Sequence, residues 1–197
     1  SFLELLLAVS ILAAMAWHTV AYERGKDTSA VDFAITLSGL VYLGWLGGYL
    51  ISLRNLTNGL YWMLLVLPSI AIADSGAFFV GRRIGRHKMA PRVSPKKSWE
   101  GYIGGIIFGS LGTMLLAFLW QFKVPEITPL RGLIMGFILA VICPLGDLGE
   151  SLLKREFGVK DSSNLLPGHG GVLDRIDSWL WAAVIGYYLI VLFWQTQ

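Results

Sequence analysis

The chain has 197 residues, of which 55% are hydrophobic and only 15% are charged, and its formal net charge is +3. Soluble domains usually carry about 25% charged residues, so this composition excludes an ordinary soluble domain and indicates a membrane protein. The only cysteine, Cys143, lies in an apolar run beside Pro144. A single cysteine excludes a disulfide framework within the chain, and we expect its thiol to be packed in the core.

Six apolar stretches are long enough to cross a bilayer, which takes about 20 residues of helix. They cover approximately residues 2–22, 31–53, 59–80, 99–122, 130–148 and 174–194. Because backbone groups in lipid must find their hydrogen bonds inside the protein, helices are the natural form of these stretches. The sequence therefore predicts an all-α fold, a polytopic integral membrane helical bundle with about six transmembrane helices.

The first two apolar stretches and the last four form two predicted parts of the chain. Residues 1–58 hold the N-terminal transmembrane helices, and because the chain opens directly in an apolar run at Ser1, we expect this part to be truncated at its N-terminus. Residues 59–197 hold the other four helices and two long polar loops, 81–98 and 149–173. These loops are the most polar segments of an apolar chain, so we expect the second part to carry the chemistry.

The basic residues are divided unequally between the five predicted loops. The second and fourth loops hold only Arg54, Lys123 and Arg131 of the 16 Lys and Arg residues, and the first, third and fifth loops hold all the others. Loops rich in Lys and Arg remain on the cytoplasmic side of a membrane. The odd-numbered loops are therefore predicted to be cytoplasmic, with both ends of this chain outside.

Four aspartates lie within or at the ends of the apolar stretches, where lipid would otherwise surround them: Asp74, Asp147, Asp174 and Asp177. A charged residue at the centre of a membrane helix costs roughly 2.5–3.5 kcal/mol on insertion scales, and such residues usually face a functional cavity. Each one alone could be a helix cap or an ion-pair partner. Four carboxylates at one level need a cation to offset their repulsion.

Helical spacing places several of these groups on common faces. Asp147, Glu150, Ser151 and Lys154 follow one another at offsets of three, four and seven, and Asp174, Asp177 and Ser178 repeat the offsets of three and four. Residues at these offsets share one face of a helix. Two helices that present carboxylates at one depth indicate a site for a hard metal ion, and oxygen ligands favour Mg²⁺ or Mn²⁺.

The third loop carries seven Lys or Arg residues. The charges alone could be an orientation signal that also touches anionic lipid headgroups. Ser94 and Pro95 have the pattern of an N-cap and a first helical residue, which would put Lys96 and Lys97 in the first turn of a helix. Cations there oppose the helix dipole, and a bound phosphate would reverse that cost. Glu100 could pair with a lysine or cap the turn.

The fifth loop contains the segment PGHGG before the last helix. Its glycines allow backbone N–H groups to approach an anion closely. His169 lies between glycines, and we favour a contact with substrate or phosphate over a simple turn residue.

Glycines recur at four-residue spacing in two stretches, at Gly44 and Gly48 and at Gly101, Gly105 and Gly109. This spacing is typical of close helix packing. It is also compatible with a homodimer.

Two segments resemble the family of CDP-diacylglycerol synthases, also called phosphatidate cytidylyltransferases. The family signature is similar to the stretch from Ser151 to Asp177, and its elements here are Ser151, Lys154-Arg155, Lys160-Asp161, His169-Gly170-Gly171 and Asp174-Arg175-Ile176-Asp177. A second segment resembles the family at Asp74, Gly81-Arg82, Ser94-Pro95, Lys97-Ser98 and Glu100-Gly101. Phe78 and Ser98 stand where members often have Tyr and Thr, which are conservative departures.

The resemblance implies a nucleotidyltransferase that moves CMP from CTP to phosphatidate, giving CDP-diacylglycerol and pyrophosphate. It implies Mg²⁺ as cofactor, with room for a second cation, and no nucleic-acid partner. We expect the metal ligands to be Asp147 and Asp174, with Asp74 and Asp177 as second choices and Glu150 as an outer partner. Catalytic roles fall to Asp147, Asp174, Lys97, Lys154 and Arg155. Substrate contacts fall to Lys96, Ser98, Ser151, Lys160, Asp161, His169, Gly170, Gly171 and Arg175.

We expect a bacterial inner membrane, although the family also has organellar members, and the basic loops predict an active site on the cytoplasmic side. Three other functions compete with the cytidylyltransferase. A transporter would also explain intramembrane carboxylates, but it does not need two basic loops. Another lipid enzyme could be a CTP-dependent polyprenol kinase or a CDP-alcohol phosphotransferase, although the latter's spaced aspartate motif is not found here. A lipid-binding scaffold would leave the aspartates unexplained. The lipid product of the reaction separates these alternatives.

Overall fold

The computed structural model describes residues 2–159, 161–163 and 171–194. Two compact units make up the chain, Ser1–Ile51 and Ser52–Gln197. Six of the described helical segments are long and apolar enough to cross a membrane. This confirms the prediction of an all-α polytopic bundle, to which the structure adds one small two-stranded sheet.

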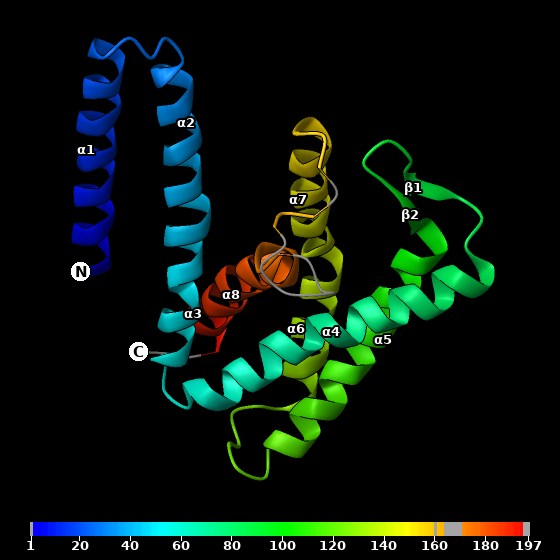
Figure 1. The fold of residues 1–197 in the computed structure, drawn as a ribbon. Coiled ribbons are helices and arrows are strands. Elements are labelled where there is room, and N and C mark those ends of the chain that lie inside the picture. Colours follow the sequence, from blue (N-terminus) through cyan, green and yellow to red (C-terminus); the bar gives the residue numbers. More distant parts are fainter. Residues whose placement is uncertain (1, 160, 164–170, 195–197) are drawn as a thin grey trace. The chain divides into compact units, whose positions relative to one another are not determined.

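The first unit is built from two long helical segments joined by a short turn (Figure 1). They are α1 (Phe2–Glu23) and a continuous segment made of α2 (Ser29–Gly39), the π-helix η1 (Leu40–Trp45) and α3 (Leu46–Arg54), whose end reaches the second unit. Within the unit, His18 Nε2 lies 3.2 Å from the Thr36 hydroxyl and ties the two segments together. Large apolar side chains such as Leu12 and Trp17 are exposed, as expected for helix faces that contact lipid.

The second unit contains α4 (Gly59–Ile84), α5 (Trp99–Trp120), α6 (Pro129–Ile142), α7 (Pro144–Glu156) and α8 (Leu173–Phe193). Between α4 and α5 stand the two antiparallel strands β1 (Lys88–Ala90) and β2 (Ser94–Ser98). The core includes Trp62, Leu65, Met135 and Leu139. Cys143 is 1% exposed, which confirms that its thiol is packed.

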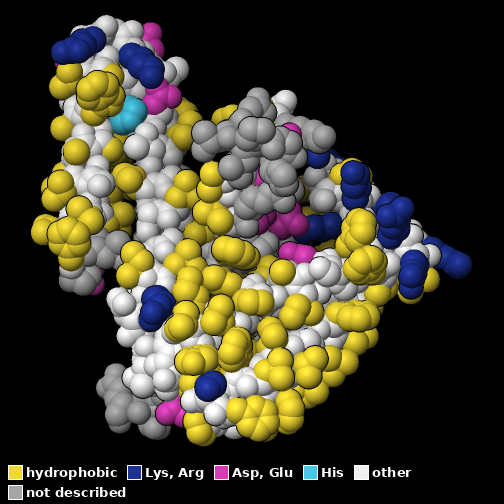
Figure 2. Space-filling view, turned by 60° about the horizontal axis from the view of Figure 1, so that its bottom comes forward, with side chains coloured by type: hydrophobic (Ala, Val, Ile, Leu, Met, Phe, Trp, Pro, Cys, Tyr) yellow, Lys and Arg dark blue, Asp and Glu magenta, His cyan; other side chains and the backbone are white. Residues whose placement is uncertain are grey.

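Helix α5 carries small residues on its buried side and large ones on its exposed side. Gly105 and Gly109 are buried, whereas Ile107, Leu111 and Leu115 are exposed. A Cβ built at Gly105 would lie 3.0 Å from the backbone oxygen of Ala73 on α4. The spacing of Gly101, Gly105 and Gly109 therefore serves helix packing within the chain, as predicted, whereas a Cβ at Gly44 would meet nothing within 4 Å. The homodimer stays a prediction. Figure 2 shows the resulting hydrophobic flank, with Lys and Arg gathered at the end formed by α4 and the strands.

The segment around Ser94 and Pro95 is not the start of a helix, contrary to the prediction. Ser94–Ser98 forms β2, and the N-cap of α5 is Ser98, whose hydroxyl accepts a hydrogen bond of 3.2 Å from the backbone N–H of Gly101. Lys96 and Lys97 therefore lie in a strand and not in the first turn of α5.

The fifth span is longer than predicted and consists of two helices. Helix α6 ends at Ile142 and α7 begins at Pro144, where the missing N–H of proline is tolerated because the first turn of a helix leaves its N–H groups unpaired. Helix α7 runs to Glu156, so the first part of the predicted loop 149–173 is helical. This extension carries the polar face that contributes to the site.

Candidate functional site

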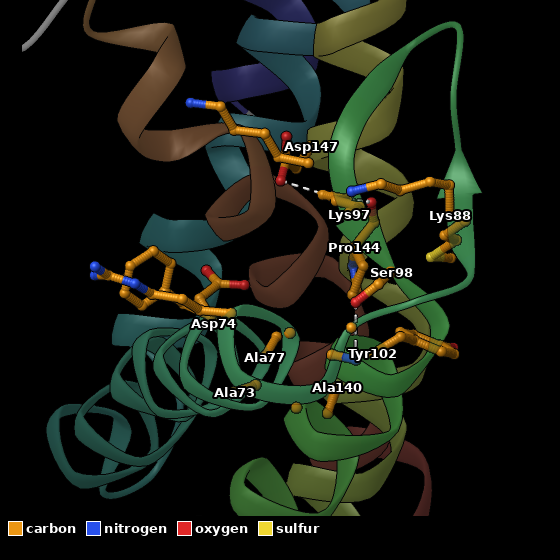
Figure 3. A pocket seen from close by; sticks show the side chains of 18 residues that line it. Ala73, Asp74, Ala77, Lys88, Lys97, Ser98, Tyr102, Ala140, Pro144 and Asp147 are labelled. Carbon is orange, nitrogen blue, oxygen red and sulfur yellow. Dashed lines mark hydrogen bonds and ion pairs between the residues drawn. The ribbon is translucent and has the colours of Figure 1, made fainter.

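A pocket of about 640 Å³ opens in the second unit between α4, the two strands, α5 and the junction of α6 with α7 (Figure 3). Cavities that bind small molecules commonly have 300–1,000 Å³. The floor is made of small apolar residues, including Ala73, Ala77, Gly101 and Ala140. A Cβ at Gly101 would lie 2.8 Å from the backbone oxygen of Ala77, so α4 and α5 touch backbone to backbone beneath the pocket.

Charged residues of both signs line the same pocket. The cations are Arg82 at the end of α4, Lys88 on β1, and Lys96 and Lys97 on β2, and the carboxylates are Asp74 on α4 and Asp147 on α7. A cavity lined by both cations and carboxylates can receive an anionic ligand together with a metal ion.

Lys97 and Asp147 form an ion pair in the lining of the pocket (Figure 3). The Lys97 ammonium lies 2.6 Å from Asp147 Oδ2 and donates a weaker hydrogen bond of 3.4 Å to the backbone oxygen of Pro144. The other oxygen of Asp147 accepts a hydrogen bond of 3.3 Å from the Ser151 hydroxyl, one turn further along α7. The strand cation is therefore held directly over the start of α7.

Three carboxylates gather beside the pocket on the facing sides of α7 and α8. Ligand oxygens of Asp147, Glu150 and Asp177 all lie within 4.8 Å of one another. Glu150 is 4% exposed and Asp177 is 8% exposed, and Glu150 Oε1 has no hydrogen-bond partner in the described part of the chain. Three carboxylates so close together, one with an unpartnered buried oxygen, fit a hard divalent cation such as Mg²⁺.

Lys154 neutralises part of this acidic region. Its ammonium lies 2.7 Å from Glu150 Oε2 and 2.6 Å from Asp174 Oδ1, and its side chain is only 17% exposed. Lys154 thus connects α7 to the first turn of α8. Since both partners are carboxylates of the protein, Lys154 is an internal counter-ion in this structure.

Asp174 forms hydrogen bonds around both of its oxygens. Besides Lys154, it accepts hydrogen bonds from the backbone N–H and hydroxyl of Ser162 and from the N–H of Gly171, at 2.7–2.9 Å. Asp174 therefore fixes the described ends of the loop to α8.

The structure brings some of the predicted metal ligands together and separates others. Asp147 and Asp177 join in the three-carboxylate group, while Asp174 stands apart from it with Lys154 and Ser162. Asp74 also lies outside the group and lines the pocket from α4. Glu150, expected as an outer partner, is a full member, and its offset of three residues from Asp147 is the sequence signal for it.

The predicted substrate contacts are spread over several places. Lys96 and Ser98 line the pocket, and Asp161 is exposed outside it. Gly171, expected to bind phosphate through its N–H, donates that hydrogen to Asp174. Arg155, expected to be catalytic, donates a hydrogen bond of 3.3 Å to the backbone oxygen of Val93 between the strands. Lys160, His169, Gly170 and the side chain of Arg175 lie outside the described residues.

A contact that sequence reasoning missed closes the base of the two strands. The carboxylate of Glu100 accepts a hydrogen bond from its own backbone N–H in the first turn of α5. Among the described residues it pairs with no lysine, and its Oε1 lies 2.6 Å from His87 Nδ1, in the segment that joins α4 to β1. No local pattern predicts this contact, because it depends on how the strands fold back onto α5.

Known proteins resemble this chain over most of its length. The sequence model of the Cytidylyltransferase family matches residues 1–193. The chain is 42% identical over 177 residues to the phosphatidate cytidylyltransferase of Bacillus subtilis (strain 168), covering 89% of this chain and 64% of that protein. It is 37% identical over 182 residues to the phosphatidate cytidylyltransferase of Staphylococcus haemolyticus (strain JCSC1435), covering 91% and 68%.

A third relative shows the same relationship over a shorter stretch. The phosphatidate cytidylyltransferase of Haemophilus influenzae (strain ATCC 51907 / DSM 11121 / KW20 / Rd) is 53% identical over 133 residues, which are 64% of this chain and 44% of that protein. The chain thus spans 44–68% of these relatives' lengths. With a family match that extends over nearly every residue, the chain belongs to the Cytidylyltransferase family.

Proposed function

We propose that this chain is the catalytic part of a phosphatidate cytidylyltransferase, which transfers CMP from CTP to phosphatidate and releases pyrophosphate. The similarity to the phosphatidate cytidylyltransferases of Bacillus subtilis and Staphylococcus haemolyticus supports this activity. The observation that carries it in this chain is the pocket itself, where a wall of lysines faces Asp147, and Asp147 belongs to a group of three carboxylates. Such a site suits two phosphorylated substrates and a metal ion.

The metal ion in this proposal is Mg²⁺, and the residues present fit it. Asp147, Glu150 and Asp177 would hold it with oxygen ligands, the kind that Mg²⁺ prefers. Asp74, on the pocket wall, would serve a second cation, whereas both oxygens of Asp174 are engaged by Lys154, Ser162 and Gly171. When bound, Mg²⁺ neutralises phosphate oxygens and so reduces the repulsion between the two anionic substrates.

The chain's own cations would position the reacting phosphates. A phosphate oxygen of phosphatidate forms a bond to the α-phosphorus of CTP, and the bond from that phosphorus to the oxygen of the leaving pyrophosphate breaks. The nucleophile already carries negative charge, so no general base is required. Lys88, Lys96 and Lys97 would bind phosphate oxygens from the strand wall. Phosphoryl-type transfer depends mostly on such positioning and charge neutralisation.

Lys154 and Arg155 would act differently from the strand lysines. Lys154 would keep Glu150 and Asp174 at a fixed separation, because its ammonium contacts both. Arg155 would hold the turn between the strands near α7 through Val93. In this proposal both residues support the site through other residues of the protein.

The proposal includes a bacterial inner membrane with the pocket on its cytoplasmic side. The distribution of Lys and Arg supports that orientation, because the basic strand wall belongs to a predicted cytoplasmic loop. CTP would then arrive from the cytoplasm, and phosphatidate would enter from the adjacent leaflet.

Incorporation of labelled CTP into lipid tests the proposed activity. The full-length protein is purified in detergent and incubated with phosphatidate, with and without Mg²⁺. We expect labelled CDP-diacylglycerol and pyrophosphate only when both phosphatidate and Mg²⁺ are present. A phosphorylated lipid in place of a CDP-lipid would instead identify a CTP-dependent lipid kinase, and the absence of any lipid product from folded protein would overturn the proposal.

A further inference from the structure

The β1–β2 hairpin, residues 88–98, forms the cationic wall of the pocket but is too small to hold its own position. Its two strands have three and five residues, and their register is irregular between Lys88 and Ala90. A single two-stranded hairpin is at best marginally stable in water. Contacts outside the hairpin must therefore decide where its lysines stand.

The carboxylate of Glu100 accepts several hydrogen bonds at the base of this hairpin. Glu100 Oε2 accepts a hydrogen bond of 3.1 Å from the backbone N–H of Arg86, and both oxygens of Glu100 lie 3.2 Å from the N–H of His87. The imidazole adds the contact of 2.6 Å from Nδ1 to Oε1. Because an ionised carboxylate can only accept hydrogen bonds, Nδ1 of His87 carries the proton.

The remaining contacts at the base show that the fit is tight. The backbone N–H of Trp99 donates a hydrogen bond of 2.9 Å to the backbone oxygen of His87. A Cβ at Gly85 would lie 2.5 Å from the Ser98 hydroxyl oxygen, so this position has no room for a side chain. The segment between α4 and β1 is thereby held against the start of α5.

Glu100 is not needed as a cap for its own helix. That role belongs to Ser98, whose hydroxyl accepts the N–H of Gly101. The carboxylate of Glu100 instead reaches the opposite side of the hairpin base, 13 and 14 residues away in the sequence. Besides its own backbone N–H, the carboxylate contacts Arg86 and His87, in the segment that carries Lys88 into the pocket.

We propose that Glu100 is a positioning residue for phosphate binding, because it holds residues 85–87 against α5 and so fixes Lys88, Lys96 and Lys97 over the pocket. This inference rests on the proposed function and adds a residue that contacts no substrate. Its loss would leave the carboxylate group on α7 and α8 intact and would loosen the wall that binds the triphosphate of CTP. Affinity for CTP should therefore suffer more than turnover at saturation.

The test compares Glu100→Ala and Glu100→Gln with Glu126→Ala in the full-length protein. Glu126 is an exposed carboxylate in the turn between α5 and α6, which makes it a matched control. Hydrogen bonds to a charged group are strong enough that their loss should raise the KM for CTP roughly tenfold or more in Glu100→Ala. We expect kcat to fall by less than about threefold, because the transferring groups remain.

The KM of Glu100→Gln for CTP should lie between those of the unaltered protein and of Glu100→Ala, since an amide keeps one acceptor oxygen. His87→Ala should raise the KM for CTP less than Glu100→Ala does, because the backbone donors remain. In the double variant it should raise the KM little beyond that of Glu100→Ala. A fall in kcat with an unchanged KM for CTP, or no change in either constant, would overturn the positioning role. CMP transfer by the unaltered protein would still leave the proposed function standing.

Hydrogen–deuterium exchange gives a second measurement that does not depend on activity. Backbone amides of residues 86–98 should exchange faster in Glu100→Ala than in Glu126→Ala, while those of α7 stay unchanged. Unaltered exchange in the hairpin would overturn the inference even if the unaltered protein formed no CDP-lipid.

Discussion

Asp147 is the residue in which the pocket and the carboxylate group meet. One of its oxygens faces Lys97 and the other faces Ser151, while Glu150 and Asp177 lie close by. Lys97 and a metal ion would compete for the same carboxylate. A metal ion on Asp147 would release the Lys97 ammonium toward phosphate, so binding of the ion and of the nucleotide should support each other.

Asp147→Asn keeps the size of the side chain and removes its charge. We expect Mg²⁺-dependent CMP transfer to fall by at least about 100-fold, the scale seen when an electrostatic group is removed from a reacting centre. Asp27→Asn, in the exposed turn after α1, is the control and should keep full activity. Full Mg²⁺-dependent activity of folded Asp147→Asn would show that the carboxylate group is not the metal site.

Glu150→Gln separates a metal ligand from a purely structural acid. If Glu150 holds the ion, the Mg²⁺ concentration for half-maximal activity should rise about 10–100-fold, because the loss of a supporting group at a metal site has effects of that size. A titration of activity with Mg²⁺ measures this half-maximal concentration, with Asp27→Asn again as the control. An unchanged Mg²⁺ requirement together with a lower melting temperature would make Glu150 only the partner of Lys154.

At the scale of single elements, the close packing of α5 and α6 depends on glycines at the positions where the two helices touch. A Cβ at Gly136 on α6 would lie 2.5 Å from the backbone oxygen of Gly109 on α5, whereas one at Gly149 on α7 meets nothing within 4 Å. Backbone cannot retreat as a flexible side chain can, so α6 would have to move away from α5.

Gly136→Ala should therefore destabilise the protein by about 1–3 kcal/mol, the usual cost of overpacking. Gly149→Ala should be neutral or stabilising, because alanine favours a helix by roughly 0.5–1 kcal/mol over glycine. Thermal unfolding of both variants in the same detergent measures the difference. Equal melting temperatures would mean that α5 and α6 are less closely packed than the structure has them.

Which elements could be predicted from the sequence depends on how local their causes are. The six spans follow from runs of apolar residues, and the common face of Asp147, Glu150 and Lys154 follows from helical spacing; the structure bears out both. The hairpin could not be predicted, because Ser94-Pro95 has the local pattern of a helix start. Its strands are decided by the pairing of Lys88 with Ser98 and by the contact of His87 with Glu100.

The candidate site follows the same division. Spacing within α7 or α8 suggests which carboxylates share a face, but it cannot say that Lys154 reaches Asp174 on the other helix. It also cannot say that Lys97 crosses from a strand to Asp147. Both are contacts between elements, and the first makes Lys154 a counter-ion of two carboxylates in this structure, while its catalytic role stays a prediction.

At the scale of the whole molecule, the predicted orientation can be tested by labelling single cysteines. Arg92→Cys places a thiol in the turn of the hairpin and Glu126→Cys places one in the turn between α5 and α6. With an impermeant maleimide, Arg92→Cys should label only in inverted membrane vesicles and Glu126→Cys only in right-side-out vesicles. The native Cys143 is buried and is the unlabelled background; the reverse pattern would contradict the predicted orientation.

The continuous helical segment made of α6 and α7 has a consequence for where the reaction can occur. It runs over 28 residues, Pro129–Glu156, and at a rise of 1.5 Å per residue it measures roughly 42 Å, against about 30 Å for the hydrocarbon layer. About eight residues of the segment therefore exceed that thickness. If the excess lies at the polar end, Asp147 and Glu150 stand at the boundary between lipid and water. A dissolved nucleotide and the headgroup of a lipid could meet there while the acyl chains never leave the bilayer.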